Sequence, residues 1–295
     1  MLEETLAALD AEDLRVLSII ESLRDRFEYV PLELIESRSR LPPARLSTVL
    51  GKLRSMRLVD FRVGSFTGYT ITFKGLDVLA LHSLKSRGVV KRLGDRIGAG
   101  KEGDVYLAEG PEGLIVVKFH RGGVRSFRKV KRFRGYVEDL PTDWIEYAKL
   151  IGEREYKVMV KLHEAKAMVP KPLGWNRHAV AQEYIEGVEL YKVKSLDPQE
   201  ALAVLNSILE TLRIAYTKVG VVHGDLSEYN VLVSNSLEAY IIDWPQYVYV
   251  EDPRAELLLK RDLEYILRFF KRRFGLTRDL EWALKFVRGE LIESS

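Results

Sequence analysis

Three polar side chains late in the chain are spaced as a phosphoryl-transfer site requires. Asp225 lies within the run from His223 to Asn230, Asn230 follows five positions later, and Asp243 ends a short apolar segment. In such sites one carboxylate orients the attacking hydroxyl, while an amide and a second carboxylate hold divalent cations beside the phosphates of ATP. The pattern therefore predicts Asp225 as the catalytic residue and Asn230 and Asp243 as ligands of Mg²⁺ or Mn²⁺.

A glycine-rich stretch upstream fits the other half of a nucleotide site. Gly98, Gly100, Gly103 and Val105 fill a GxGxxGxV pattern, with Lys101 between the second and third glycines. Glycines at these positions let backbone amides close over phosphates without obstruction from side chains. Taken alone, the stretch is also compatible with an ordinary glycine-rich hairpin turn.

Lys118 ends the apolar run 114–117 that follows the glycine stretch. A buried strand seldom ends in an unpaired ammonium group, which favours a phosphate and a carboxylate as its partners. Glu155, on a helix expected from about residue 144 to 163, is the predicted carboxylate, and Glu153 is the alternative. The competing interpretation is a lysine at a sheet edge and glutamates that face solvent.

Composition narrows the remaining chemistry. The chain has 295 residues and 33.9 kDa, with 46 Lys and Arg against 43 Asp and Glu, so its net charge of +3 points to no particular partner. It has no cysteine, which excludes disulfide partners, thiolate zinc sites and thiol nucleophiles. An acidic N-terminus and the lack of a long apolar run predict a cytoplasmic protein without membrane contact.

The segment up to about Arg87 reads as a separate module. Asp10 is expected to cap a helix that runs to about Asp25, Pro31 opens a second helix, and Pro42-Pro43 opens a third. Two strand-like pieces, 58–63 and 69–73, flank a predicted hairpin at 64–68. Three helices followed by a hairpin predict a winged helix, a variant of the helix-turn-helix.

Arg45 and Lys52 are candidates for nucleic-acid contact. They share the polar stripe of the third helix with Thr48 and Ser55, opposite its apolar stripe. A groove-reading helix is built in this way. A solvated helix face and a protein-binding surface are the alternatives.

A second basic segment, residues 121–134, contains no acidic residue. Its candidates for contact with RNA phosphates are Arg125, Arg128, Lys129, Lys131 and Arg132. A solvated linker is the alternative interpretation. Ser126 within it offers a hydroxyl group for autophosphorylation.

Several of these stretches resemble the Rio family of atypical protein kinases, in particular its second, winged-helix-containing subfamily. The matching motifs are the glycine stretch from Gly98 to Tyr106, Pro170-Lys171-Pro172 with Asn176-Arg177-His178, the run from His223 to Asn230, and Ile242 to Gln246. The resemblance implies an α/β (α+β) fold, with a winged helix at 1–87 followed by a reduced bilobal kinase-like domain at 88–295. Within that domain the expected N-lobe covers about 88–182, the hinge about 183–186 and the C-lobe about 187–295.

The resemblance also implies roles for individual residues. Asp225 matches the catalytic aspartate, Lys118 the phosphate-binding lysine, and Asp243 both a metal ligand and a transient phosphate acceptor. The backbone carbonyl of Glu183 and the amide of Ile185 match the groups that bind adenine. The family usually has Ser where this chain has Gly103, which leaves Lys101 to carry more of the phosphate contact.

Three classes of function follow from these patterns. The first, which the Rio resemblance implies, is an ATP- and Mg²⁺-dependent serine kinase or ATPase that acts on the precursor of the small ribosomal subunit and its rRNA. Its sequence departs from peptide kinases, because Trp244-Pro245 replaces Phe-Gly after the metal-binding aspartate and Ser227 replaces the usual lysine of the catalytic loop. The alternatives are a small-molecule kinase of the aminoglycoside or choline kind, and an RNA-binding module with a relic kinase lobe.

Overall fold

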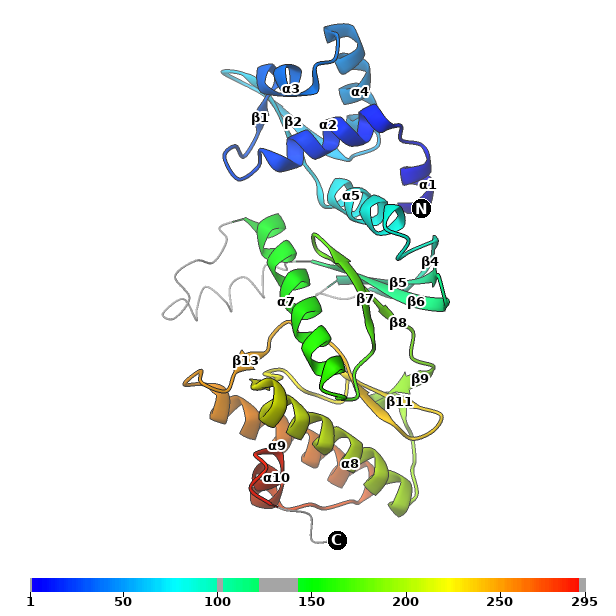
Figure 1. Cartoon of the computed structure of the whole chain (residues 1–295), viewed down its shortest axis with the longest axis vertical. Helices are drawn as coiled ribbons and strands as arrows, with labels where there is room; N and C mark the ends of the chain where they lie inside the picture. Colours follow the sequence, from blue (N-terminus) through cyan, green and yellow to red (C-terminus); the bar gives the residue numbers. More distant parts are fainter. Residues whose placement is uncertain (1, 100–102, 122–142, 292–295) are drawn as a thin grey trace. The chain divides into compact units, whose positions relative to one another are not determined.

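The computed structural model describes residues 2–99, 103–121 and 143–291, and these form two compact units (Figure 1). Unit 1 comprises Met1–Glu153 and Gly174–Ala181, and unit 2 comprises Arg154–Leu173 and Gln182–Ser295. Some of the predicted site residues lie outside the described residues: Gly100, Lys101, Arg125, Ser126, Arg128, Lys129, Lys131 and Arg132.

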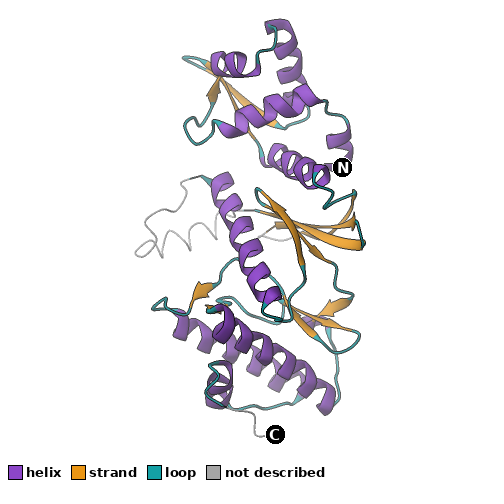
Figure 2. Ribbon diagram, in the orientation of Figure 1, coloured by secondary structure: helices purple, strands orange, loops and turns teal. Residues whose placement is uncertain are grey.

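Unit 1 begins with short helices around a small sheet (Figure 2). The helices are α1 (Leu2–Ala7), α2 (Ala11–Ser22), α3 (Leu32–Ser39), α4 (Pro43–Ser55) and α5 (Phe73–Ser86). The Asp10 carboxylate caps α2 by accepting the amides of Glu12 and Asp13, as its position predicts, although α2 ends at Ser22, before Asp25. Pro31 and Pro42 stand at the N-caps of α3 and α4, where the missing amide hydrogen costs nothing.

The small sheet has the strand order β1-β3-β2. Its strands are β1 (Val30–Pro31), β2 (Val59–Val63) and β3 (Thr67–Ile71). β2 and β3 are antiparallel, with Phe61 opposite Tyr69 and Arg62 opposite Gly68. Gly68 therefore belongs to a strand, and the turn of this hairpin is shorter than the predicted 64–68.

A five-stranded sheet with the order β4-β5-β6-β8-β7 follows. Its strands are β4 (Arg92–Ala99), β5 (Gly103–Gly110), β6 (Gly113–His120), β7 (Pro172–Asn176) and β8 (Ala179–Glu183). β4, β5 and β6 form an antiparallel meander, and the His120 amide donates to the His178 carbonyl at 2.9 Å. This meander carries the glycine stretch and Lys118.

Helix α7 (Trp144–Glu164) agrees with the predicted helix and passes from unit 1 into unit 2. Unit 2 also contains β9 (Gly187–Glu189), a 3₁₀ turn at Leu190–Lys192, α8 (Pro198–Ile214) and a π-helical turn at Ala215–Val219. They are followed by β10 (Val221–Val222), β11 (Val231–Ser234), β12 (Ala239–Ile241), β13 (Val248–Tyr249), α9 (Ala255–Phe274) and α10 (Leu280–Val287).

The hydrophobic core of unit 2 lies between α8, α9, α10 and the short strands (Figure 1). Trp244 and Phe270 are its largest fully buried side chains. Buried apolar surface stabilises a fold by about 25 cal/mol per Å². This core therefore stabilises the elements from which the loops of the candidate site emerge. Across the described ranges, no helix is long and apolar enough to cross a membrane.

Candidate active site

The loop between β10 and β11 closes on itself around Asp225. The Asn230 side-chain nitrogen donates to the Asp225 carbonyl at 2.9 Å, and the Asn230 amide donates to the Ser227 carbonyl at 3.0 Å. The Asp225 amide donates to Nδ1 of the buried His223 at 3.2 Å. These bonds fix the backbone of the loop while the Asp225 side chain stays exposed.

Asp262 on α9 holds the backbone of the same loop by hydrogen bonds. Its carboxylate is only 1% exposed and accepts the amides of Gly224 at 2.8 Å and Leu226 at 3.3 Å. Arg261 donates to the Gly224 carbonyl. Burial raises the pKa of Asp262, although the His223 and Arg261 charges and the Gly224 amide oppose this rise. The residues on both sides of Asp225 are thus held by one buried carboxylate.

Gly224 is required at its position for two reasons. Its φ of 79° lies in the left-handed region that side chains disfavour, and an added Cβ would approach the Gln246 carbonyl oxygen to 2.8 Å. The glycine therefore allows the catalytic loop to pass close to the segment that follows Asp243.

The two predicted metal ligands come together through one strand pair. β11 and β12 are antiparallel, with Val231 opposite Ile241, and the Ile242 amide donates to the Asn230 carbonyl at 2.9 Å. Asn230 and Asp243 therefore lie at the same end of this pair. Asp243 has a φ of 66°, a conformation of higher energy that is common at functional sites.

Trp244 and His223 hold the backbone beside Asp243. The buried Trp244 indole donates to the Ile241 carbonyl at 3.1 Å, and its ring lies 4.6 Å from the His223 ring. His223 Nε2 lies 3.2 Å from the Ile242 carbonyl. Trp244, which stands where peptide kinases have the Phe of Phe-Gly, thus holds this turn against the core.

In unit 1 the described residues of the glycine stretch lie at the end of β4 and the start of β5. Gly98 is opposite Val105 across β4 and β5, and Val105 is opposite Lys118 across β5 and β6. The register shifts between Arg96 and Gly98, which marks an irregularity near the end of β4. Three of the residues predicted to contact the nucleotide therefore lie side by side in one row of the meander.

Gly103 has a packing reason of its own. A Cβ built at this position would lie 2.5 Å from the Phe119 carbonyl oxygen on β6. Contacts this short do not occur, so a larger residue would force β5 and β6 apart. The departure from the family pattern at this position is therefore matched by a close approach of the two strands.

The remaining predicted nucleotide contacts lie in unit 2. Glu155 on α7 is 1% exposed, whereas Glu153, at the end of the unit 1 segment, is half-buried. Burial favours Glu155 as the carboxylate that needs a charged partner. Before Ile185, the Glu183 amide donates to the Lys171 carbonyl at 2.9 Å, and the Lys171 amide donates to the Glu183 carboxylate at 3.1 Å. The predicted pairing of Glu155 with Lys118 and the adenine contacts stay predictions.

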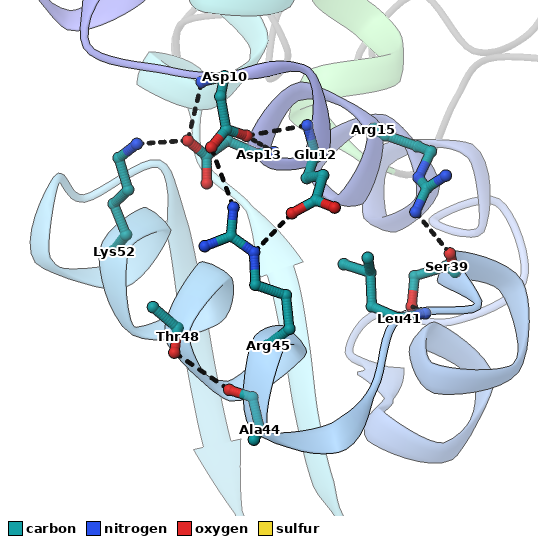
Figure 3. Close-up of polar contacts among 10 residues, drawn as sticks. All are labelled: Asp10, Glu12, Asp13, Arg15, Ser39, Leu41, Ala44, Arg45, Thr48 and Lys52. Atoms are coloured by element: carbon teal, nitrogen blue, oxygen red, sulfur yellow. Dashed lines mark hydrogen bonds and ion pairs between the residues drawn. The ribbon is translucent and has the colours of Figure 1, made fainter.

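The winged-helix candidates Arg45 and Lys52 are engaged within the protein (Figure 3). Arg45 pairs with Glu12 at 2.5 Å and with Asp10 at 3.2 Å, and Lys52 pairs with Asp13 at 2.5 Å. Asp13 is 1% exposed. The acidic N-terminus of α2 therefore pairs with both side chains, and their contact with nucleic acid stays a prediction.

Two family models cover most of the chain. The RIO domain family matches residues 104–282, and the family described as Rio2, N-terminal matches residues 6–87. The chain belongs to the RIO family of atypical protein kinases. It is 36% identical to the RIO-type serine/threonine-protein kinase Rio2 of Methanocaldococcus jannaschii, over 83% of this chain and 91% of that protein.

Two further relatives set the extent of the similarity. The serine/threonine-protein kinase RIO2 of Caenorhabditis elegans is 35% identical over 90% of this chain, and the chain spans 50% of that longer protein. The Rio2 kinase from Chaetomium thermophilum, solved as an ADP/Mg²⁺-phosphoaspartate complex, superposes with a TM-score of 0.82 at 32% identity. That match covers 97% of this chain and 88% of the Chaetomium one.

RIO membership confirms the predicted fold class, a winged helix followed by a kinase-like domain. It also overturns the alternative of an aminoglycoside- or choline-type kinase. Sequence reasoning assigned no role to Asp262 or Arg261, although both support the catalytic loop. The available signal was a carboxylate at a core position of α9, between the buried Leu259 and Leu263.

Proposed function

We propose that this chain is an ATP-dependent phosphotransferase and ATPase of the serine/threonine kinase class, with Asp225, Asn230 and Asp243 at its chemical centre. The observation that carries the proposal is the convergence of these residues in unit 2. The Asn230 side-chain nitrogen donates to the backbone carbonyl of Asp225. The backbone carbonyl of Asn230 accepts the amide of Ile242, the residue before Asp243. Metal ligands and the catalytic carboxylate are positioned in this way for phosphoryl transfer.

The polar groups present fit Mg²⁺. Because the Asn230 side-chain nitrogen donates to the Asp225 carbonyl, its side-chain oxygen is the atom left for a cation, and Asp243 would supply the second ligand. In the part of the chain that the structure describes, no three His, Cys, Asp or Glu side chains form a metal-binding group. Mg²⁺ is commonly held by one or two protein oxygens together with substrate phosphates and water, so the ion would arrive with ATP. When bound, it would neutralise charge on the phosphates.

Described residues of the glycine stretch and Lys118 are assigned to the phosphates of ATP. Gly98, Val105 and Lys118 share one row of the β4–β6 meander, which supports their role at the phosphates. The family resemblance supports the assignments of Glu155 as the carboxylate for Lys118 and of the Glu183 and Ile185 backbone as the adenine-binding groups.

Within this proposal Asp243 is also the first phosphate acceptor. An oxygen of its carboxylate forms a bond to the γ-phosphorus while the bond to the β,γ-bridging oxygen breaks, and ADP leaves. Water then attacks the acyl phosphate, gives up a proton, and restores the carboxylate with release of inorganic phosphate. Asp225 orients the water and takes its proton. The phosphoaspartate of the Chaetomium relative and the unusual φ of Asp243 support this assignment.

The competing acceptor is a serine hydroxyl, with Ser126 as the candidate within the chain. Acyl phosphates are cleaved by hydroxylamine, whereas phosphoserine is stable to it. We expect label from [γ-³²P]ATP to be removed by hydroxylamine and to be absent from Asp243→Asn. Label that survives hydroxylamine and disappears in Ser126→Ala would replace the ATPase with a self-phosphorylating serine kinase.

The proposal extends to a partner, the small ribosomal subunit precursor and its rRNA, and to a cytoplasmic location. In the winged-helix module, basic side chains other than Arg45 and Lys52 support contact with RNA. Arg54, Arg57 and Arg62 are exposed near the β2–β3 hairpin, and the Arg54 guanidinium lies 3.4 Å from the centre of the Phe61 ring. Exposed arginines beside an aromatic ring suit phosphates and stacked bases.

A further inference from the structure

Arg121 joins two carboxylates that come from distant parts of unit 1. It follows β6, and its guanidinium donates to both oxygens of Asp77, each at 2.7 Å. The same group lies 3.1 Å from Asp104. The side chains of Arg121, Asp77 and Asp104 are only 23%, 10% and 21% exposed. A two-pronged, largely buried pair of this kind fixes direction as well as distance.

The two carboxylates belong to different functional segments. Asp77 lies on α5, within the stretch that matches the Rio2 N-terminal family. Asp104 directly follows Gly103 at the start of β5. Arg121 therefore connects the winged-helix module to the strand that carries Gly103 and Val105.

His178 completes the cluster and leaves Asp77 little room to move. Its Nε2 lies 2.7 Å from Asp77 Oδ1 and 3.1 Å from Arg121, and its side chain is fully buried. Phe73 and Phe119 pack around it, with ring centres 6.1 and 5.7 Å from the imidazole. Because the charges are shielded from water, removal of one partner would leave the others unsatisfied.

We propose that Arg121 is a positioning residue that sets the start of β5, where Gly103 and Val105 lie, against α5. The winged-helix module thereby determines how well these β5 residues are placed to bind ATP. The inference rests on the proposed function, because it concerns the affinity of the ATP site. It assigns Arg121 a role distinct from that of the basic segment it precedes, since its guanidinium is occupied by Asp77 and Asp104.

The test measures nucleotide affinity and turnover separately in the full-length protein. Arg121→Gln and Asp77→Asn are each expected to raise the Kd for ADP and the KM for ATP by about 5- to 50-fold, within the usual range of coupling between sites. We expect kcat to change less than about 3-fold, because no catalytic group moves. Arg121→Lys should recover part of the affinity, since it keeps the charge and loses the two-pronged geometry.

Arg96→Gln is the matched control. Arg96 also pairs with Asp104, at 3.2 Å. Its side chain is 54% exposed, however, and the pair joins the neighbouring strands β4 and β5, without a link to α5. Its substitution should change the Kd for ADP less than 2-fold. The Kd for ADP of the double variant Arg121→Gln/Asp77→Asn should be no higher than that of the single variant with the higher Kd, because both changes break the same link.

Three results would overturn the inference. An unchanged Kd in variants with lower melting temperatures would reduce Arg121 to a structural role, and equal effects of Arg96→Gln would remove the link to α5. A loss of RNA affinity with normal ADP binding would make Arg121 a phosphate contact for RNA. If Arg121→Gln does not fold, Asp77→Asn and Arg121→Lys decide by the same criteria. An unmutated chain that binds no nucleotide would instead refute the proposed function.

Discussion

The Asp262 carboxylate accepts the Gly224 amide at 2.8 Å, so a buried acid on α9 holds the backbone next to the catalytic Asp225. The same carboxylate accepts the Leu226 amide at 3.3 Å. A carboxylate can accept both bonds, whereas an amide side chain must present a donor at one of its two positions.

The substitution Asp262→Asn should therefore loosen the catalytic loop. We expect kcat to fall by about 10- to 100-fold and the free energy of unfolding by about 1–3 kcal/mol, the cost of an unsatisfied buried group. ATP turnover and urea denaturation measure the two effects. Glu264→Gln, two residues further along α9, is the control. Normal turnover in Asp262→Asn would show that the loop holds its shape without this anchor.

Substitution of Asp225 should slow the chemical step and leave the affinity for ATP nearly unchanged. Its side chain is exposed at the loop, while the loop backbone is held by bonds that do not involve its carboxylate. Asp225→Asn should slow turnover by about 100- to 10,000-fold, about 3 to 5 kcal/mol, with little change in ATP affinity. Steady-state kinetics and fluorescence titration with ADP separate these quantities, and Glu251→Gln serves as an exposed control. Unchanged turnover would refute the assignment.

Local spacing made the chemical residues predictable. Asp225, Asn230 and Asp243 lie on one loop and one strand pair, so their proximity follows from short-range pairing that a sequence pattern can express. Asp262 and the Asp77–His178 pair meet their partners over long sequence separations, 38 and 101 residues. Such contacts depend on how whole elements pack. The core position of Asp262 on α9 could single out the residue, but no local pattern identifies its partners.

The fate of Arg45 and Lys52 shows the same limit. Helical spacing correctly placed both on the polar stripe of α4, opposite the apolar residues. It could not show that the stripe faces the capping carboxylates of α2, which lie more than 30 residues earlier in the chain. Charge complementarity between α2 and α4 was present in the sequence, but only the fold shows that the two sets meet.

This pairing predicts opposite effects for two groups of bases. Neutralising Arg54, Arg57 and Arg62 should weaken binding to a small-subunit rRNA fragment and reduce the log-log salt slope by about 0.7 to 0.9 for each lost contact. Neutralising Arg45 and Lys52 should leave the slope unchanged and lower the free energy of unfolding by about 1–3 kcal/mol, since Asp13 would be buried without its partner. The reverse pattern would return the RNA interface to the predicted stripe on α4.

Gly103 yields a prediction about the glycine stretch. A side chain there would meet the Phe119 carbonyl, so Gly103→Ser should destabilise the protein by about 1–3 kcal/mol, the usual cost of overpacking. Gly98→Ala is the matched control for stability, because its Cβ would meet Val105 at an ordinary 3.4 Å. Thermal unfolding of both variants measures the difference. Equal melting temperatures would mean that β5 and β6 separate at no cost.

His178 should make the stability of the protein depend on pH in a defined window. Burial lowers the pKa of His178 from 6.5, and although Asp77 opposes this shift, the charges of Arg121 and His120 add to it. The unfolded chain therefore takes up a proton near pH 6.5 while the folded chain resists it. The contribution of His178 to the free energy of unfolding should be present above pH 6.5. It should be lost as the pH falls below 6.5, by up to about 1.4 kcal/mol per pH unit.

Asp77 acts in a separate and more acidic window, which supplies the control. Burial alone would raise its pKa, but the hydrogen bonds and charges of His178 and Arg121 outweigh burial and hold the pKa below 3.8. Its contribution is present above pH 3.8 and is lost only as the pH falls further. Urea denaturation at pH 7.5 and 5.5 should show a slope that His178→Gln removes and Asp77→Asn retains. A slope that persists in His178→Gln would place the responsible proton on another group.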